Sequence, residues 1–281
     1  SQFVRLTWAD LGRIISALAL ELEWGLYTCM GRVIVVANQK GGVGKTTTAV
    51  NLAACMAAAG RSTLLVDLDP QGNASSGVGI DRAALERTVY DVLVDGVALR
   101  EVVMPGPVEF LAVAPSTKDL VGAEVELVNA EGREFRLRGQ IEAIRDGYEY
   151  IFIDCPPSLG LLTLNGLVAA DGVLITLQCE YYALEGLSEL LHTIVLVRDG
   201  LNPQLKLQGV LLTMFQHTNL SNQVVADVRA HLGQKVYETV IPRNVTLSEA
   251  PSFGKPVILY DAKSPGARAY IALAAEVAAR G

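Results

Sequence analysis

The sequence predicts a single α/β domain with a mostly parallel, twisted sheet and helices on both of its faces. From residue 31 onward, short runs rich in β-branched residues alternate with longer Ala/Leu-rich runs, an order typical of parallel sheets with crossover helices. Several short runs, such as VIVVA and VLITL, are apolar or nearly so along their whole length, as expected of strands covered on both faces. A glycine-rich loop joins the first strand to the first helix.

The predicted strands are short apolar runs bounded by polar or turn-forming residues. They span residues 32–37, 63–67, 109–113, 150–154, 172–178, 207–213 and 235–240. The predicted helices span residues 47–59, 161–169, 184–198 and 223–232. Gly60 follows the first of these helices and indicates its end, because glycine readily adopts the left-handed conformation found there.

Two segments carry weaker patterns. Residues 71–107 are the least regular part of the chain, and QGNASSGVG is expected to be a mobile loop. Residues 123–138 mix charges of both signs on a helical period. This pattern favours a solvated helix for Arg133, Arg136 and Arg138 over a binding patch.

The composition is that of a folded protein without an overall positive surface. Apolar residues make up 51% of the 281 residues, charged residues make up 19%, and the formal net charge is −7. Disorder is therefore not expected. The net charge does not exclude nucleic-acid binding, because a local basic face is compatible with an acidic total.

The cysteines and the N-terminal residues indicate where in the cell the protein is expected. The four cysteines form no C-x-x-C pair, which favours reduced thiols in a cytosolic protein over a zinc site or disulfides. Residues 1–29 are interpreted as an extension before a domain at 30–281. The apolar run at residues 13–26 is interrupted by Arg13, Glu21 and Glu23, and it is shorter than the roughly 18 uncharged residues that a membrane span needs. A cytoplasmic protein is expected.

Residues 40–47, KGGVGKTT, have the features of a phosphate-binding loop between a strand and a helix. Glycines let several backbone N–H groups approach phosphate oxygens, and the helix adds its N-terminal amides and dipole. Lys45 is expected to reach the β- and γ-phosphates and the Thr46 hydroxyl to ligate Mg²⁺. Gln39 replaces the first glycine of the usual pattern, and Lys40 is an additional lysine. The sequence thus predicts a single P-loop NTPase domain with a deviant phosphate loop that binds ATP.

Three aspartates follow predicted strands at the edge where the loops gather. Within STLLVDLDPQGN, Asp67 and Asp69 stand at the end of one predicted strand. Within YIFIDCPP, Asp154 stands at the end of another. A lone aspartate after a strand is often only a turn former. Near a phosphate loop, such a carboxylate can hold Mg²⁺ directly or through water, which favours a functional role and makes Asp154 the candidate Walker-B acid.

Together these motifs resemble the ParA/Soj family of chromosome- and plasmid-partitioning ATPases. KGGVGKTT, DLDPQGN, FIDCPPSLGLLTLN, IPRNVTLSEAPSFGKPV and YDAKSPGARAY occur in this order and cover about residues 31–279. Several independent motifs in one order make the resemblance specific. The wider superfamily, which includes MinD-like, nitrogenase-iron-protein-like and arsenite-pump-like ATPases, shares the deviant loop.

The resemblance implies a role for each matching residue. Lys40 matches the signature lysine, which reaches the partner's phosphates across a nucleotide-sandwich dimer, and Lys45 matches the phosphate lysine. Asp69 matches the acid that orients the attacking water, so Lys40, Lys45 and Asp69 are the implied catalytic residues. Asp67 and Asp154 are implied at the metal with Thr46. The further implied nucleotide contacts are Gly41, Gly42, Val43, Gly44, Thr47 and, in the loop that reads the adenine ring, Pro242 and Asn244.

The same resemblance implies partners: a homodimer when ATP is bound, a ParB/Spo0J-like protein that stimulates slow hydrolysis, and non-specific DNA, with no membrane. It implies a nucleoid-associated location. Members commonly use arginines near the segments matching TMFQHTNLS and PRNVTLSEAP, whereas His217 and Thr246 stand here, so fewer phosphate contacts are expected. A substitute basic face is predicted from Arg229, Lys255, Lys263 and Arg268.

Two other functions remain open at this stage. A MinD-like membrane-positioning ATPase needs a basic amphipathic C-terminal helix, whereas ARAYIALAAEVAARG is Ala-rich and weakly charged and is expected to close the core. A relative of the nitrogenase iron protein needs cysteines that ligate an iron–sulfur cluster at a dimer interface. Cys155 follows the Walker-B candidate and Cys179 ends a strand, so neither is well placed for this.

Overall fold

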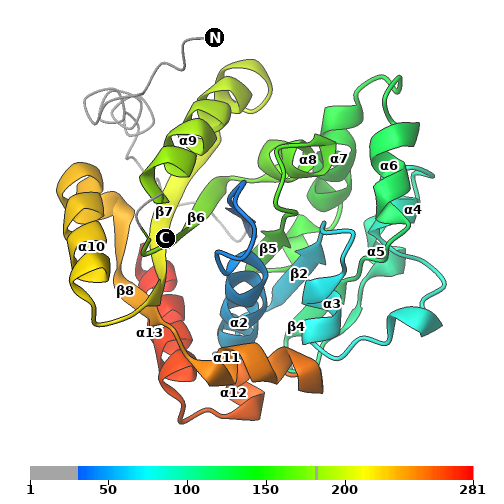
Figure 1. Cartoon of the computed structure of the whole chain (residues 1–281). Helices are drawn as coiled ribbons and strands as arrows, with labels where there is room; N and C mark the ends of the chain where they lie inside the picture. Colours follow the sequence, from blue (N-terminus) through cyan, green and yellow to red (C-terminus); the bar gives the residue numbers. More distant parts are fainter. Residues whose placement is uncertain (1–30, 181–182, 281) are drawn as a thin grey trace.

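The structure is a computed structural model that describes residues 31–180 and 183–280. An eight-stranded sheet lies between two layers of helices (Figure 1). The strand order is β3-β4-β2-β5-β1-β6-β7-β8, and the strands pair in parallel except for the edge pair β3–β4. The predicted fold class is therefore confirmed. The N-terminal extension at 1–29 lies outside the described residues.

The strands that form the sheet follow the predicted ones closely. They are β1 (Arg32–Ala37), β2 (Thr63–Asp67), β3 (Met104–Pro105), β4 (Leu111–Ala114), β5 (Tyr150–Asp154), β6 (Gly172–Gln178), β7 (Lys206–Phe215) and β8 (Val236–Pro242). The strand expected at 109–113 begins later, because Phe110 has a φ of 66° and cannot continue an extended strand. The edge strand β3 is too short to leave a periodic signal and was not predicted.

Short helices are more numerous than the sequence indicated. The α-helices are α2 (Lys45–Ala58), α3 (Asn73–Gly77), α4 (Val89–Leu93), α5 (Leu99–Val102), α6 (Leu120–Glu126), α7 (Arg136–Glu142), α8 (Leu161–Ala169), α9 (Ala183–Gly200), α10 (Asn219–Leu232), α11 (Val245–Glu249), α12 (Val257–Tyr260) and α13 (Pro265–Ala279).

Two of the weaker expectations were wrong. QGNASSGVG is not an irregular loop, because it contains α3. Residues 123–138 do not form one helix: α6 ends at Glu126, and α7 begins only at Arg136. Gly132 lies between them with a φ of 63°, a conformation that breaks a helix.

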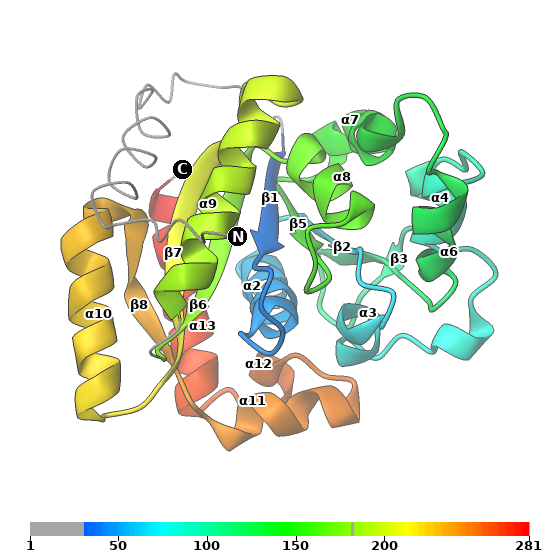
Figure 2. The ribbon, with the colours of Figure 1, turned by 45° about the horizontal axis from the view of Figure 1, so that its top comes forward.

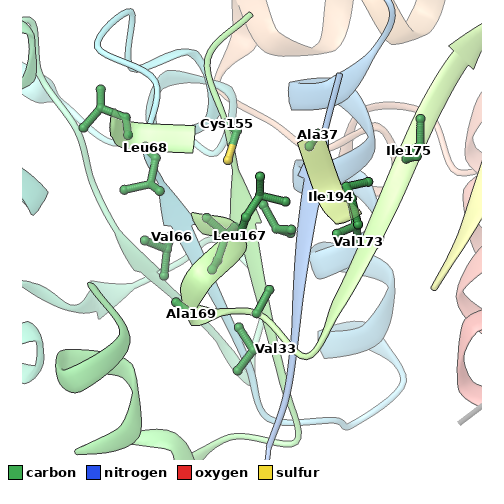
Figure 3. Close-up of a cluster of buried hydrophobic side chains, with 14 of the residues drawn as sticks. Val33, Ala37, Val66, Leu68, Cys155, Leu167, Ala169, Val173, Ile175 and Ile194 are labelled. Atoms are coloured by element: carbon green, nitrogen blue, oxygen red, sulfur yellow. The ribbon is translucent and has the colours of Figure 1, made fainter. Parts of the chain in front are cut away.

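The core consists of two apolar layers, one on each side of the sheet. Along β1, Val33, Val35 and Ala37 belong to one layer, whereas Ile34 and Val36 belong to the other, as the two-residue period of a strand requires. Helices α7, α8 and α9 cover the first face, and α2 and α13 cover the second (Figure 1). Figure 3 shows the first layer, where side chains of β1, β2 and β6 and Cys155, which follows β5, meet those of α8 and α9.

The parallel arrangement brings the loops after β1, β2 and β5 to one edge of the sheet. Asp67, the last residue of β2, is in register with Asp154, the last residue of β5, and β5 pairs with β1 on its other side. In Figure 2 the loop after β1 lies between the ends of these strands and the N-terminus of α2. The fold therefore gathers the predicted loop and acids at one place.

The C-terminal helix α13 closes the second face of the sheet, as expected. Its buried residues include Tyr270, Leu273 and Val277. At the edge strand β8, the Glu276 carboxylate accepts the N–H groups of Glu238 and Thr239 at 2.8 and 3.0 Å, which satisfies strand groups that would otherwise be unpaired. Among the described helices, none is both long and apolar enough to cross a bilayer.

Gly166 allows α8 to approach the sheet beside Asp154. A Cβ at this position would lie 2.9 Å from Cys155 Sγ and 3.2 Å from Val35 Cγ2. Gly166→Ala is therefore expected to lower the free energy of unfolding by about 1–3 kcal/mol through overpacking. Gly139→Ala in α7 is the matched control, because a Cβ there meets nothing within 4 Å, and it should raise that free energy by up to about 1 kcal/mol. Urea unfolding measures both, and equal effects would contradict this packing argument.

Candidate nucleotide and metal site

The phosphate loop is held open by hydrogen bonds at its start and by glycines at its end. The Asn38 side chain donates to the Thr176 carbonyl oxygen at 2.7 Å and accepts the Lys40 N–H at 2.9 Å. Gly42 and Gly44 have φ values of 73° and 86°, which glycine adopts without strain. Gly41 and Gly42 are exposed, so the backbone of the loop can approach a ligand closely.

Lys45 and the start of α2 supply the positive charge. The Lys45 side chain is buried, and its Nζ donates to the Lys40 carbonyl oxygen at 3.0 Å. Burial lowers the pKa of this ammonium, while Asp154, Cys155 and Asp69 raise it. The first turn of α2 contains Thr46 and Thr47, and no described side chain caps it at Gly44. Uncapped N-terminal amides and a nearby ammonium are the groups that bind phosphate.

The end of β7 connects the phosphate loop to the loop predicted to read the base. The Thr213 hydroxyl donates to the Val43 carbonyl oxygen at 2.9 Å, and the Arg243 N–H donates to the Phe215 carbonyl oxygen at 2.9 Å. Between them Met214 has a φ of 52°, which is rare for a residue with a side chain. Sequence reasoning missed Thr213, and its place at the end of a parallel strand was the available signal.

The predicted adenine-reading residues lie beyond this connection. Pro242 is the last residue of β8, and Asn244 immediately precedes α11. The Asn244 Oδ1 atom is buried and has no hydrogen-bond partner among the described residues. A buried polar atom without a partner is unusual in a folded protein, and it is consistent with a ligand contact there. The adenine role of both residues stays a prediction.

Asp154 has the environment of a metal ligand. It is fully buried, and neither carboxylate oxygen meets a hydrogen-bond partner among the described residues. Burial raises its pKa well above the ordinary value, the Asp67 carboxylate raises it further, and the Thr46 hydroxyl and Lys45 ammonium oppose this. An unpartnered buried carboxylate beside a helical threonine hydroxyl fits Mg²⁺, which uses one or two protein oxygens and completes its shell with phosphates and water.

Asp67 and Asp69 lie beside Asp154, but their carboxylates accept hydrogen bonds from neighbouring residues of the chain. Both Asp67 oxygens accept hydrogen bonds, from the N–H of Asp69 and from the N–H and hydroxyl of Ser75. The pKa of Asp67 is raised to about 6, because the effect of burial exceeds the opposing effect of these hydrogen bonds. Asp69 is also buried, and its Oδ1 accepts the Gln71 N–H at 2.9 Å. The metal role of Asp67 and the catalytic role of Asp69 stay predictions.

Lys40 lies apart from these buried groups. Its side chain is 45% exposed, and its Nζ forms an ion pair with Glu180 at 3.2 Å. The neighbouring Gln39 side chain donates to Glu189 on α9. The Lys40 side chain is therefore directed toward the segment after β6 and not toward the buried aspartates. Sequence reasoning did not identify Glu180 as its partner.

The predicted basic face is divided. Arg229 on α10 donates to the Glu238 carbonyl oxygen at 2.9 Å and pairs with the Glu238 carboxylate at 3.5 Å. Lys255, Lys263 and Arg268 are exposed on the segment around α12 and α13. The fold thus keeps three of the four predicted residues on one C-terminal segment, whereas Arg229 is engaged with the edge strand.

The described cysteines are buried and do not form a metal site. Cys155 and Cys179 lie in the core, and burial raises the pKa of both thiols. Within residues 31–180 and 183–280, no three His, Cys, Asp or Glu side chains are grouped to hold a metal ion by themselves. Mg²⁺ held with a nucleotide's phosphates does not require such a group.

Comparisons with known proteins give one matching family model and several similar partitioning proteins. Residues 31–207 match the family model described as an AAA domain. The chromosome partitioning protein ParA of Myxococcus xanthus (strain DK1622) is 58% identical over 255 residues, 90% of each chain. The sporulation initiation inhibitor protein Soj of Bacillus subtilis (strain 168) is 58% identical over 253 residues, which are 90% of this chain and 100% of Soj.

Solved structures show the same fold. Cobyrinic acid a,c-diamide synthase from Mycobacterium smegmatis, with bound ADP and magnesium, superposes with a TM-score of 0.77 at 39% identity over 88% of this chain and 93% of that one. The cell division ATPase MinD of Pyrococcus furiosus superposes with a TM-score of 0.75 at 26% identity over 90% of this chain and 100% of that one. The partitioning proteins, at 58% identity, are more similar to this chain in sequence than these two proteins of known structure are. At this level of identity over nine-tenths of its length, the chain belongs to the ParA/Soj family of chromosome-partitioning ATPases.

Proposed function

We propose that this partitioning ATPase binds ATP with Mg²⁺ at the site described above and hydrolyses it slowly to control its own dimerisation and DNA association. The observation that carries the proposal is the pairing of an open glycine loop around the buried Lys45 with the buried, unpartnered carboxylate of Asp154. The M. smegmatis protein with bound ADP and magnesium, 39% identical to this chain, supports the same ligands here.

Each group of residues in the site has a different role in phosphoryl transfer. The loop amides and Lys45 bind the β- and γ-phosphates and offset their negative charge. Thr46 and Asp154 would hold Mg²⁺, which would supply positive charge to offset the negative charge of the phosphates. Asp69 orients the attacking water. Pro242 and Asn244 contact the adenine ring, which places the γ-phosphate in a fixed position over the loop.

Lys40 provides the dimer switch in this proposal. Two nucleotides that face each other carry a large negative charge, so a dimer across them needs additional cations. The exposed Lys40 ammonium supplies one to the partner's phosphates, as an arginine finger does in other NTPases. It must first leave Glu180, an exposed ion pair of the kind worth no more than about 1 kcal/mol. Loss of the γ-phosphate removes the attraction and releases the dimer.

DNA and a ParB-like protein are the proposed partners, and the nucleoid in the cytoplasm is the proposed location. Lys255, Lys263 and Arg268 supply exposed cations on one segment, and dimerisation doubles them, which strengthens phosphate contacts without sequence preference. A MinD-like membrane role is less well supported, because the apolar side of α13 packs into the core through residues such as Tyr270 and Leu273 and is not available to a bilayer.

The two loop lysines should separate nucleotide binding from dimerisation. Lys45→Ala should abolish ATP binding, because it removes the buried phosphate cation. Lys40→Ala should leave ATP bound, since Lys40 is exposed and paired elsewhere, but should lose ATP-dependent dimerisation and hydrolysis. Calorimetry measures the first effect and light scattering the second. Normal dimerisation of the Lys40→Ala protein with ATP would show that this lysine does not act on a partner.

Removing the proposed water-orienting acid should trap the ATP-bound state. Asp69→Ala should lower the hydrolysis rate by about 100-fold or more while ATP still produces the dimer. This trapped dimer should retard DNA in a gel at low salt, with retardation that weakens steeply as salt rises. Hydrolysis at the parental rate would remove Asp69 from the mechanism, and no retardation at low salt would contradict the DNA proposal.

Mg²⁺ binding to the ATP complex should strengthen as pH rises. The pKa of Asp154 is raised by burial and by Asp67, so a proton competes with the metal at low pH and is released when the metal binds. Calorimetry in two buffers of different ionisation enthalpy gives the number of protons released, expected to be up to about one per site. Asp154→Asn is the control, and the same proton release in that variant would contradict the assignment.

A further inference from the structure

Asp67 accepts three hydrogen bonds from its own chain. Its Oδ1 accepts the Asp69 N–H at 3.1 Å, and its Oδ2 accepts both the Ser75 N–H at 2.8 Å and the Ser75 hydroxyl at 2.7 Å. All three residues are buried. Hydrogen bonds to a carboxylate are among the stronger ones in a protein, so this arrangement fixes the carboxylate in place.

Ser75 extends the arrangement to a third element. Its Oγ, which donates to Asp67, also accepts the Ser116 N–H at 3.0 Å, and Ser116 is fully buried. One hydroxyl therefore joins the end of β2, the helix α3 and the segment that follows β4. The small size of Ser75 matters, because it occupies a position with no exposed surface.

The neighbouring acid has the opposite arrangement. Asp154 is in register with Asp67 on the adjacent strand and equally buried, yet its two oxygens have no hydrogen-bond partner among the described residues. The neighbouring group that acts on the carboxylate is the Thr46 hydroxyl, which lowers its pKa and is itself a predicted Mg²⁺ ligand, so a cation can bind the Asp154 oxygens without displacing a backbone hydrogen bond. At Asp67 three of the roughly four lone-pair positions already accept hydrogen bonds, so a cation would have to share the carboxylate with the donors that hold the backbone after β2.

We propose that Ser75 and Asp67 are positioning residues for Asp69 and that Asp154, without Asp67, provides the carboxylate for Mg²⁺. This inference rests on the proposed ATP hydrolysis. Asp67 holds the Asp69 N–H directly, and the turn that follows is closed by the Asp69 carbonyl oxygen, which accepts the Gly72 N–H at 2.8 Å. The Asp69 carboxylate accepts the Gln71 N–H, so its direction follows the direction of this turn.

A pair of adjacent serines provides a matched test. Ser75→Ala removes the hydroxyl between Asp67 and Ser116, whereas Ser76→Ala removes a hydroxyl that donates only within the turn, to the Gly72 carbonyl oxygen at 3.0 Å. Ser75→Ala should lower kcat between about tenfold and about a hundredfold, as expected when a reacting group is displaced by a fraction of an ångström. The KM for ATP and the calorimetric Kd for ATP with Mg²⁺ should stay at parental values, and Ser76→Ala should resemble the parent throughout.

Variants of the two aspartates should differ in the Mg²⁺ concentration that ATP binding requires. Asp67→Asn should lower kcat with the Mg²⁺ concentration for half-maximal ATP binding unchanged, whereas Asp154→Asn should raise that concentration at least about tenfold. A raised Mg²⁺ requirement in Asp67→Asn would overturn the proposal and return Asp67 to the metal. A parental kcat in Ser75→Ala would overturn the role of Ser75, and so would a parallel rise in KM and Kd, which would indicate general loosening.

A readout without nucleotide covers the case in which a variant is too unstable to assay. In the parent protein, NMR hydrogen exchange of the Asp69 and Ser116 amides should be slow, and in Ser75→Ala or Ser75→Cys the exchange of both should accelerate relative to the other amides of β2. Unchanged exchange overturns the proposal. If the parent protein itself does not hydrolyse ATP, the proposed function fails, while the exchange result still judges the hydrogen-bond arrangement.

Discussion

The burial of a lysine ammonium opposite buried carboxylates at one edge of a parallel sheet is the constraint on which the site depends. Lys45 loses most of its hydration, which lowers its pKa, and a buried charge is tolerated only when it is compensated. The Lys40 carbonyl oxygen and the nearby aspartates provide part of that compensation. A triphosphate supplies the rest, because it brings negative charge to the lysine and carries a cation to the carboxylates. The geometry is therefore better suited to the ligand than to water.

This arrangement is costly to the fold in the absence of ligand. Asp154 is buried without hydrogen-bond partners among the described residues, and Met214 adopts a left-handed conformation at the end of β7. Each feature costs free energy on the order of 1–3 kcal/mol. The surrounding strands offset these costs, since β1, β2 and β5 are buried on both faces. Strained and unpartnered groups concentrated at one edge of a well-packed sheet are typical of functional sites.

The regular part of the fold could be predicted from the sequence because its signals are local. Continuous apolar runs identified the central strands, and the glycine loop with its following helix identified the phosphate site. The helix α3 could not be predicted, because its polar sequence NASSG carries no helical period and its Ser75 is held by a contact with the distant Asp67. Similarly, Thr213 and Glu180 are recognised only by what they contact, namely Val43 and Lys40. Such contacts join residues distant in the sequence, which a pattern within one segment does not contain.

Two side-chain contacts attach α2 to the C-terminal segment, and they bear on how ATP would control DNA binding in the proposed function. The Thr48 and Tyr270 hydroxyls lie 3.1 Å apart, and the Asn51 side chain accepts the Val257 N–H at 2.7 Å. The helix whose first turn faces the phosphates is thus bonded along its side to α12 and α13, beside the exposed Lys263 and Arg268. A segment fixed in this way is poorly placed to rearrange into a new basic surface. In the proposed function, nucleotide would therefore control DNA affinity by bringing two such segments together, because two linked surfaces bind a polyanion far more tightly than one.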